Sequence, residues 1–183
     1  IESILNSFYL ALAAYKIDII THELQKAKEV LGPRALCLEI IVPLFREIGK
    51  RVMSGALTIA QEHTISALVR FYMGQMIGQH YQKNLQRDDL VLITTPEGEL
   101  HEIGILGAAL ICVHYGVRFI YLGTNLPAES LAEAANALNP KAILLGSTRF
   151  DLLNNSSLED YIKTYKEHAK VPSALWVGGN FKP

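Results

Sequence analysis

A histidine with an acid before it and a glycine after it is the strongest chemical signal in the sequence. Glu99, His101 and Gly104 follow a short apolar run at residues 90–94. A carboxylate near a histidine can accept the N–H of one ring nitrogen, which fixes the tautomer and leaves the other nitrogen to bind a metal. Zinc needs three or four protein ligands, whereas one protein ligand suffices when a macrocycle supplies the others. Taken alone, the same residues also fit an ordinary loop histidine beside a solvated acid.

Three more segments carry small or polar residues where apolar runs end, at 123–127, 146–149 and 178–180. In an open parallel sheet, ligands bind beyond the carboxyl ends of the strands, near the point where the strand order reverses. All four segments would then share one edge of a sheet. The sequence lacks the G-x-G-x-x-G fingerprint, the Walker P-loop and the nucleophile elbow. Dinucleotide binding, P-loop chemistry and α/β-hydrolase chemistry are therefore not expected.

The second half of the sequence alternates between strands and helices. Apolar runs at 90–94, 117–122, 141–145 and 174–177 predict strands, and the segments 102–115, 127–138 and 158–170 predict helices. This alternation is typical of a parallel sheet with helices on both faces. Residues 86–183 are thus expected to form a doubly wound, flavodoxin-like or Rossmann-like α/β domain. It has either four strands or a fifth, last strand outside this sequence.

Residues 1–85 have the pattern of helices throughout. Apolar residues recur at helical spacing in four stretches, at 2–15, 18–30, 35–52 and from 58 onward. Asp18 is expected to cap the second helix, and Thr58 with Gln61 fits a capping box for the fourth. Pro43 should kink the third helix or mark a late start. The pattern predicts a four-helix bundle, followed by a polar linker at 82–89.

The composition limits the partners of the chain. Its 183 residues carry 17 Lys and Arg against 18 Asp and Glu, a formal net charge of −1. DNA binding by these residues themselves is not expected, because neutralising phosphates needs a clustered excess of cations. No apolar run reaches the ~20 residues that span a bilayer, so no membrane partner is expected. Cys37 and Cys112 lie among apolar neighbours and predict reduced core thiols in a cytoplasmic protein.

The ordered residues at the strand ends resemble the signature of cobalamin (vitamin B12)-binding domains. Glu99-x-His101-x-x-Gly104, then Ser147, then Gly178-Gly179 is similar to the family pattern D-x-H-x-x-G, S-x-L and G-G. The resemblance implies that His101 binds cobalt as the lower axial ligand, in place of a displaced benzimidazole base. It implies that Ser147, with Thr148 beside it, bonds that base, and that the double glycine gives the nucleotide tail room. A helical bundle over the upper cobalt face belongs to the same layout.

Two branches of this family share the layout. One holds the corrinoid methyl carriers and the methionine synthase module, and the other holds the MerR-type, light-sensing transcriptional regulators that use adenosylcobalamin. Glu62 and His63 are similar to a Glu-His pair of the regulators, whose glutamate faces the adenosyl group and whose histidine can capture cobalt after light breaks the cobalt–carbon bond. Glu99 in place of the carriers' usual Asp, and a start at Ile1 that fits removal of a DNA-binding domain, favour the same branch. Without the resemblance, Glu62 is an ordinary acid in the first turn of a helix.

The resemblance implies a cobalamin sensor and photoreceptor in a transcriptional regulator, not an enzyme. Loss of the upper cobalt ligand would shift the bundle and change self-association, as a dimer or tetramer, and with it DNA binding through a domain outside this chain. Two positions depart from the family pattern, since Val52 replaces a tryptophan of the regulators and Arg149 replaces a leucine. The alternatives are a corrinoid methyl carrier that serves a cobalamin-dependent methyltransferase, and an interaction domain that kept the fold without cobalamin.

Overall fold

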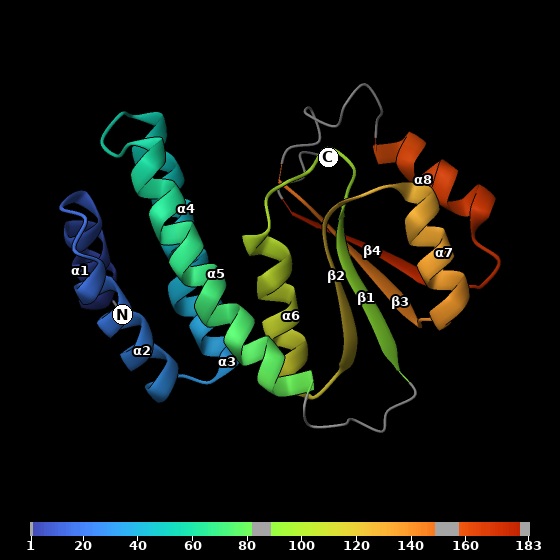
Figure 1. The fold of residues 1–183 in the computed structure, drawn as a ribbon, viewed down its shortest axis with the longest axis horizontal. Coiled ribbons are helices and arrows are strands. Elements are labelled where there is room, and N and C mark those ends of the chain that lie inside the picture. Colours follow the sequence, from blue (N-terminus) through green and yellow to red (C-terminus); the bar gives the residue numbers. More distant parts are fainter. Residues whose placement is uncertain (1, 82–88, 149–157, 180–183) are drawn as a thin grey trace. The chain divides into compact units, whose positions relative to one another are not determined.

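The computed structural model of the chain describes residues 2–81, 89–148 and 158–179 (Figure 1). Two compact units divide the chain, Ile1–Lys83 and Asn84–Pro183. The described part of the first unit is helical, and that of the second is a parallel sheet with helices. The change from helical to alternating apolar spacing in the sequence thus coincides with the change of architecture. Within the described ranges, no helix is both long and apolar enough to cross a membrane.

Four helical stretches make up the described part of the first unit. They comprise α1 (Glu2–Ala13), α2 (Ile17–Val30), the continuous run of α3 (Pro33–Ala35), η1 (Leu36–Ile41) and α4 (Val42–Met53), and α5 (Ile59–Tyr81). Their apolar faces form a core in which twelve large side chains are at most 2% exposed: Phe8, Leu12, Ile20, Leu24, Leu36, Ile40, Ile41, Leu44, Ile48, Ile65, Val69 and Met73. Burial of these faces stabilises helices that would be marginal alone.

Pro43 changes the type of helix without breaking it. The residues before it form the π-helix η1, after which the N–H of Val42 donates to the carbonyl of Cys37, five residues back. This wider turn accommodates Pro43, which has no N–H to donate and lies in the first turn of α4. The helical stretch begins at Pro33 and is continuous through Pro43, so the expected late start is wrong, and Pro43 marks a switch from π- to α-helix instead.

The two expected helix caps have opposite outcomes. The prediction for Asp18 is wrong, because α2 already begins at Ile17 and Lys16 takes the cap position without a side-chain hydrogen bond. The capping box of α5 is confirmed. The Thr58 N–H donates to Gln61 Oε1 at 2.8 Å, and the Gln61 N–H donates to Thr58 Oγ1 at 3.2 Å. Reciprocal bonds of this kind satisfy two helix-terminal donors at once.

The second unit is a doubly wound α/β domain, as expected. Its described elements are β1 (Leu90–Pro96), α6 (Ile103–Tyr115), β2 (Arg118–Leu126), α7 (Ala128–Leu138), β3 (Ala142–Ser147), α8 (Leu158–His168) and β4 (Ala174–Gly179). The described strands pair in parallel in the order β2-β1-β3-β4. Figure 1 shows α6 on one face of the sheet and α7 with α8 on the other.

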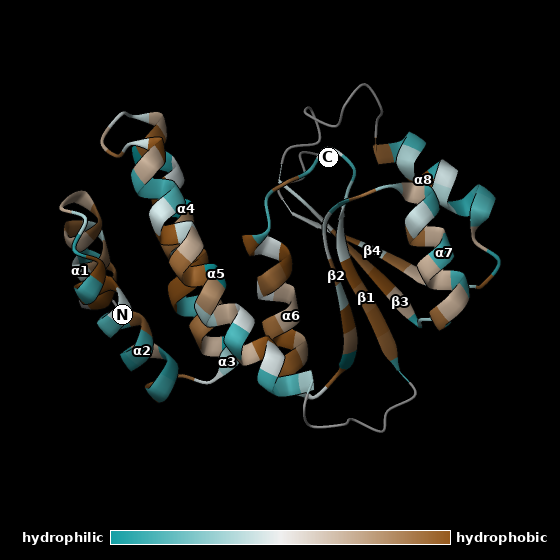
Figure 2. Cartoon of the chain, in the orientation of Figure 1, coloured by the Kyte–Doolittle hydropathy of each residue, from teal (hydrophilic) through white to brown (hydrophobic). Residues whose placement is uncertain are grey.

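β1 lies inside the sheet and is buried along its whole length. On the face covered by α7 and α8, Leu92 and Ile143 of the strands join Leu131 and Tyr161 of the helices in one cluster. In Figure 2 the strands are mainly brown, which marks hydrophobic residues, and α8 carries teal, hydrophilic residues. Because β2 and β3 lie on opposite sides of β1, the strand order reverses between β1 and β3. The carboxyl ends of these two strands are the place where such sheets bind ligands.

Every strand extends past the end predicted from its apolar run, so part of each polar segment belongs to the sheet. Ser147 and Gly179, for example, are paired across β3 and β4. The end of β2 is irregular, since its register against β1 shifts between Ile93 and Thr94 and again between Thr94 and Pro96. Asn125, in this irregular stretch, has a positive φ of 59°.

Candidate functional site

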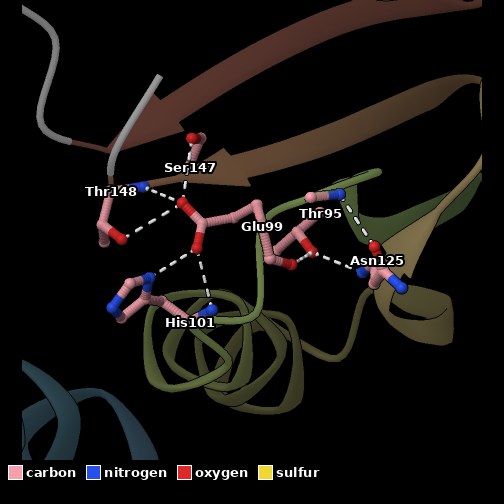
Figure 3. A network of polar contacts seen from close by, with 7 residues as sticks. Thr95, Glu99, His101, Asn125, Ser147 and Thr148 are labelled. Atoms are coloured by element: carbon pink, nitrogen blue, oxygen red, sulfur yellow. Dashed lines mark hydrogen bonds and ion pairs between the residues drawn. The ribbon is translucent and has the colours of Figure 1, made fainter. Parts of the chain in front are cut away.

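Glu99 is a buried carboxylate in the loop after β1, with a side chain only 2% exposed. Its Oε1 accepts the backbone N–H of His101 at 2.8 Å and lies 2.5 Å from His101 Nδ1. Its Oε2 accepts the N–H of Thr148 at 2.7 Å, the Thr148 hydroxyl at 3.1 Å and the Ser147 hydroxyl at 3.0 Å (Figure 3). A buried carboxylate is costly unless it is well hydrogen-bonded, and these five contacts meet that need.

The same carboxylate decides which nitrogen of His101 is available. With Glu99 as acceptor, Nδ1 carries the proton and Nε2 keeps its lone pair. Among the described residues, Nε2 has no hydrogen-bond partner, and the His101 side chain is 57% exposed. An imidazole held on one side by a carboxylate and open on the other has the arrangement of a metal-ligating histidine.

Ser147 ends β3, and Thr148 follows it. The Ser147 side chain is buried, and its hydroxyl donates to Glu99 across 48 residues of sequence. The sequence analysis expected this hydroxyl to bond the base of a ligand. A base nitrogen without a proton would have to compete with Glu99 for the hydrogen of the Ser147 hydroxyl. A ligand group that donates a hydrogen bond could still use the lone pairs of the Ser147 oxygen.

The glycines of the pattern have different surroundings. A Cβ added at Gly104 or at Gly178 would meet nothing within 4 Å, so both positions border free space. At Gly179, φ is +138° and a Cβ would lie 1.6 Å from the carbonyl oxygen of Ser147, so the chain's own packing requires glycine there. The pair therefore combines one glycine that leaves space with one that the sheet itself needs.

Two residues of the site were not identified from the sequence. Thr95 Oγ1 donates to the carbonyl of Glu99 at 2.6 Å and accepts the N–H of Asn125 at 2.9 Å. Asn125 Oδ1 accepts the N–H of Gly98 at 2.7 Å. The sequence analysis placed both turns at one edge of the sheet, but the frequency of Asn and Gly in turns could not reveal that the Asn125 side chain reaches the Gly98 N–H.

The other expected site residues belong to the helical unit. Glu62 Oε1 accepts the Ser66 hydroxyl at 2.5 Å, and Glu62 Oε2 lies 3.4 Å from His63 Nε2. The Glu62 side chain is 31% exposed and that of His63 is 75% exposed. Val52, in the last turn of α4, is half-buried. Glu62 is thus tied to its own helix on both oxygens, whereas most of the His63 ring faces away from protein.

Comparisons with known proteins show what the chain is similar to. Residues 4–76 match the family model of the B12 binding domain. The chain is also 35% identical over 95% of its length to the HTH-type transcriptional repressor CarH of Myxococcus xanthus. A second repressor of that organism, CarA, is 30% identical over 97% of the chain. The chain spans 56% and 58% of the length of these two curated relatives.

A solved structure has the same fold as this chain. The monomethylamine corrinoid protein of Methanosarcina barkeri superposes with a TM-score of 0.71 at 15% identity, over 97% of this chain and 84% of that one. The described site suits a corrinoid as well. Nε2 of His101 is an open donor for a metal whose other ligands come from a macrocycle, and Gly104 and Gly178 border space that side chains would otherwise fill.

Proposed function

We propose that this chain is the cobalamin-binding sensor part of a transcriptional regulator. The pairing of the exposed His101 ring with the buried Glu99 carboxylate carries the proposal. Similarity to two transcriptional repressors over nearly the whole chain supports a regulator over an enzyme. DNA would be bound by a domain outside this chain, which has a net charge of only −1. The two free cysteines suit a cytoplasmic location.

On this proposal, the residues of the sheet unit hold the lower side of the cofactor. His101 would bind cobalt through Nε2, while Glu99 keeps the proton on Nδ1 and is itself held by Ser147 and Thr148. Gly104 and Gly178, with Gly179 beside them, would leave room for the nucleotide tail. Bound cobalamin would supply a cobalt centre whose upper ligand can be exchanged or removed by light.

The helical unit would respond to the upper ligand. Adenosylcobalamin is the form we propose, with Glu62 facing the adenosyl group and His63 able to bind cobalt once that group is lost. A ligand can shift a protein between two states only through contacts that differ between them. Loss of the adenosyl contact at Glu62 would be that difference, and it would change self-association between states such as monomer, dimer and tetramer.

The test combines visible spectra with a mass measurement. The protein is mixed in the dark with adenosyl-, methyl- or hydroxocobalamin, and spectra and light-scattering mass are recorded before and after green light. We expect binding of adenosylcobalamin, a histidine-ligated spectrum that is lost in His101→Ala, and a change of mass after light. His114→Ala, an exposed histidine of α6, serves as the matched control. If none of the three forms binds, or if His101→Ala leaves the spectrum unchanged, the proposal is wrong.

A corrinoid methyl carrier is the second candidate. The observation that favours it is Val52, which by the resemblance stands where the light-sensing regulators have a tryptophan, so that the upper side of the cofactor would be covered differently. The same experiment separates the two functions. A carrier would bind methylcobalamin, keep its mass in the light, and lose the methyl group to an acceptor when a cobalamin-dependent methyltransferase is added.

A further inference from the structure

The loop that carries Glu99 and His101 is held through its backbone as well as through the carboxylate. The Thr95 hydroxyl donates to the Glu99 carbonyl and accepts the Asn125 N–H, at 2.6 and 2.9 Å. The Asn125 side chain accepts the Gly98 N–H at 2.7 Å. We call Thr95, Gly98 and Asn125 the loop clamp; Figure 3 shows Thr95 and Asn125 on the opposite side of Glu99 from Ser147 and Thr148.

The irregular end of β2 is what brings Asn125 to the loop. Regular pairing is interrupted twice between β1 and β2 there, and irregularities of this kind re-aim side chains near functional sites. The φ of 59° at Asn125 is one that Asn adopts more readily than other non-glycine residues. Gly98, with φ 88°, lies in a turn closed by the Glu99 N–H and the Pro96 carbonyl at 3.1 Å.

The Thr95 part of the clamp lies away from water, whereas Asn125 is exposed at the sheet edge. Thr95 is fully buried at 0% exposed, and Glu99 is 2% exposed. A buried hydroxyl that both donates and accepts is expensive to remove, because the Glu99 carbonyl and the Asn125 N–H would each lose a partner. With its carboxylate fixed by β3 and its carbonyl fixed by β1, Glu99 cannot move without breaking hydrogen bonds at both ends.

We propose that the loop clamp positions His101 for cobalt, so that Thr95 and Asn125 are positioning residues for the axial ligand. This inference rests on the proposed function, because it concerns the same histidine. Neither residue has a hydrogen bond with His101 among the described contacts, and their effect passes through Glu99. A direct partner of a ligating histidine, such as Glu99, changes metal affinity by about 10- to 100-fold when it is removed, and the clamp residues behind Glu99 are expected at the lower end of that range.

Two matched pairs of variants test the clamp. Asn125→Gly keeps the positive φ and removes the acceptor for Gly98, whereas Asn125→Asp keeps an acceptor oxygen. Thr95→Val keeps the shape and removes the hydroxyl, whereas Thr95→Ser keeps the hydroxyl. We expect Asn125→Gly and Thr95→Val to bind hydroxocobalamin about tenfold more weakly and with a smaller histidine-ligated fraction in the spectrum. Asn125→Asp and Thr95→Ser should stay close to wild type.

A second readout needs no cofactor. Long-range proton–nitrogen NMR correlations report which ring nitrogen of His101 carries the proton, and we expect Nδ1 in the wild type but a mixture of tautomers in Asn125→Gly and Thr95→Val. Unchanged tautomer and unchanged cobalamin affinity in the folded variants would overturn the clamp. If the wild type bound no cobalamin, the proposed function would fail, and the NMR experiment would still decide the clamp. If Thr95→Val does not fold, the Asn125 pair decides it.

Discussion

The buried carboxylate of Glu99 lies 2.5 Å from Nδ1 of the exposed His101 ring. The contact joins the Glu99 carboxylate, which is shielded from water, to the His101 ring, which a ligand can reach. Since the other carboxylate oxygen is bound at the end of β3, the orientation of His101 depends on the packing of the sheet and not on its own loop alone. Changes to these partners should therefore alter both stability and the state of the histidine.

Glu99→Gln should destabilise the sheet unit by about 1–3 kcal/mol, because one amide offers fewer acceptor sites than a carboxylate and turns its NH2 toward donors. The amide NH2 of Gln would then point either at the two N–H groups of His101 or at the backbone N–H of Thr148. In both cases one donor would face another donor. Urea unfolding measures the loss, and Glu97→Gln, at an exposed acid two residues earlier, is the control. Equal unfolding free energies for the two variants would contradict the hydrogen bonds described for Glu99.

Gly179→Ala should cost at least about 3 kcal/mol, because a Cβ there would overlap the Ser147 carbonyl and strain a backbone with positive φ. Gly178→Ala is the matched control and should stay within about 1 kcal/mol of wild type, since its Cβ meets nothing within 4 Å. Thermal and urea unfolding compare the two. On the proposed function, Gly178→Ala keeps its stability but weakens cobalamin binding. The opposite order of stabilities would refute the roles assigned to these two glycines.

Gln61→Glu should destabilise the helical unit by about 1–3 kcal/mol. Gln61 Nε2 donates to the carbonyls of Ala13 at 3.1 Å and Leu12 at 3.4 Å, at the carboxyl end of α1. A carboxylate keeps the bond to the Thr58 N–H but places negative charge against those carbonyls, at the negative end of a helix dipole. Circular dichroism during urea unfolding measures the change. Thr58→Ser, which keeps the cap hydroxyl, is the control. If Gln61→Glu were as stable as Thr58→Ser, the hydrogen bonds that link α5 to the end of α1 would be disproved.

Alkaline pH should lower stability through Cys112. Burial raises the pKa of the Cys112 thiol to about 11, from an ordinary value of 9.0. Below pH 9 the thiol is protonated in both states; between the two values the unfolded chain has released the proton and the folded chain keeps it. The unfolded state then binds fewer protons, so the free energy of unfolding falls as pH rises through this window.

The share due to Cys112 is measured with Cys112→Ala. The difference in unfolding free energy between about pH 8 and about pH 10.5 should be smaller in this variant than in wild type. Some decrease will remain, because burial also raises the pKa of Cys37 and of Tyr9. An identical pH difference in both proteins would show that the thiol is not shielded in solution.

Much of the fold could be predicted because its signals are local. Apolar spacing distinguishes helices from strands, and the capping box at Thr58 needs only residues within one turn. Asp18 shows the limit of such signals, since a good capping residue became part of the first turn when the cap position of α2 fell two residues earlier, at Lys16. The strands also continued past their apolar runs, because backbone pairing persists where side chains turn polar.

By itself the sequence determined that Glu99 and His101 are two residues apart, close enough for one carboxylate to hold one imidazole, and that a parallel sheet places the loops after its strands along one edge. Only the tertiary structure decided that Ser147 and Thr148 complete the shell of Glu99, that Asn125 reaches Gly98, and that Gly179 serves packing while Gly178 borders open space. The physical reason is distance along the chain. Contacts between residues near in sequence follow from spacing, whereas contacts across 30 or 48 residues depend on strand order and on the register at the end of β2.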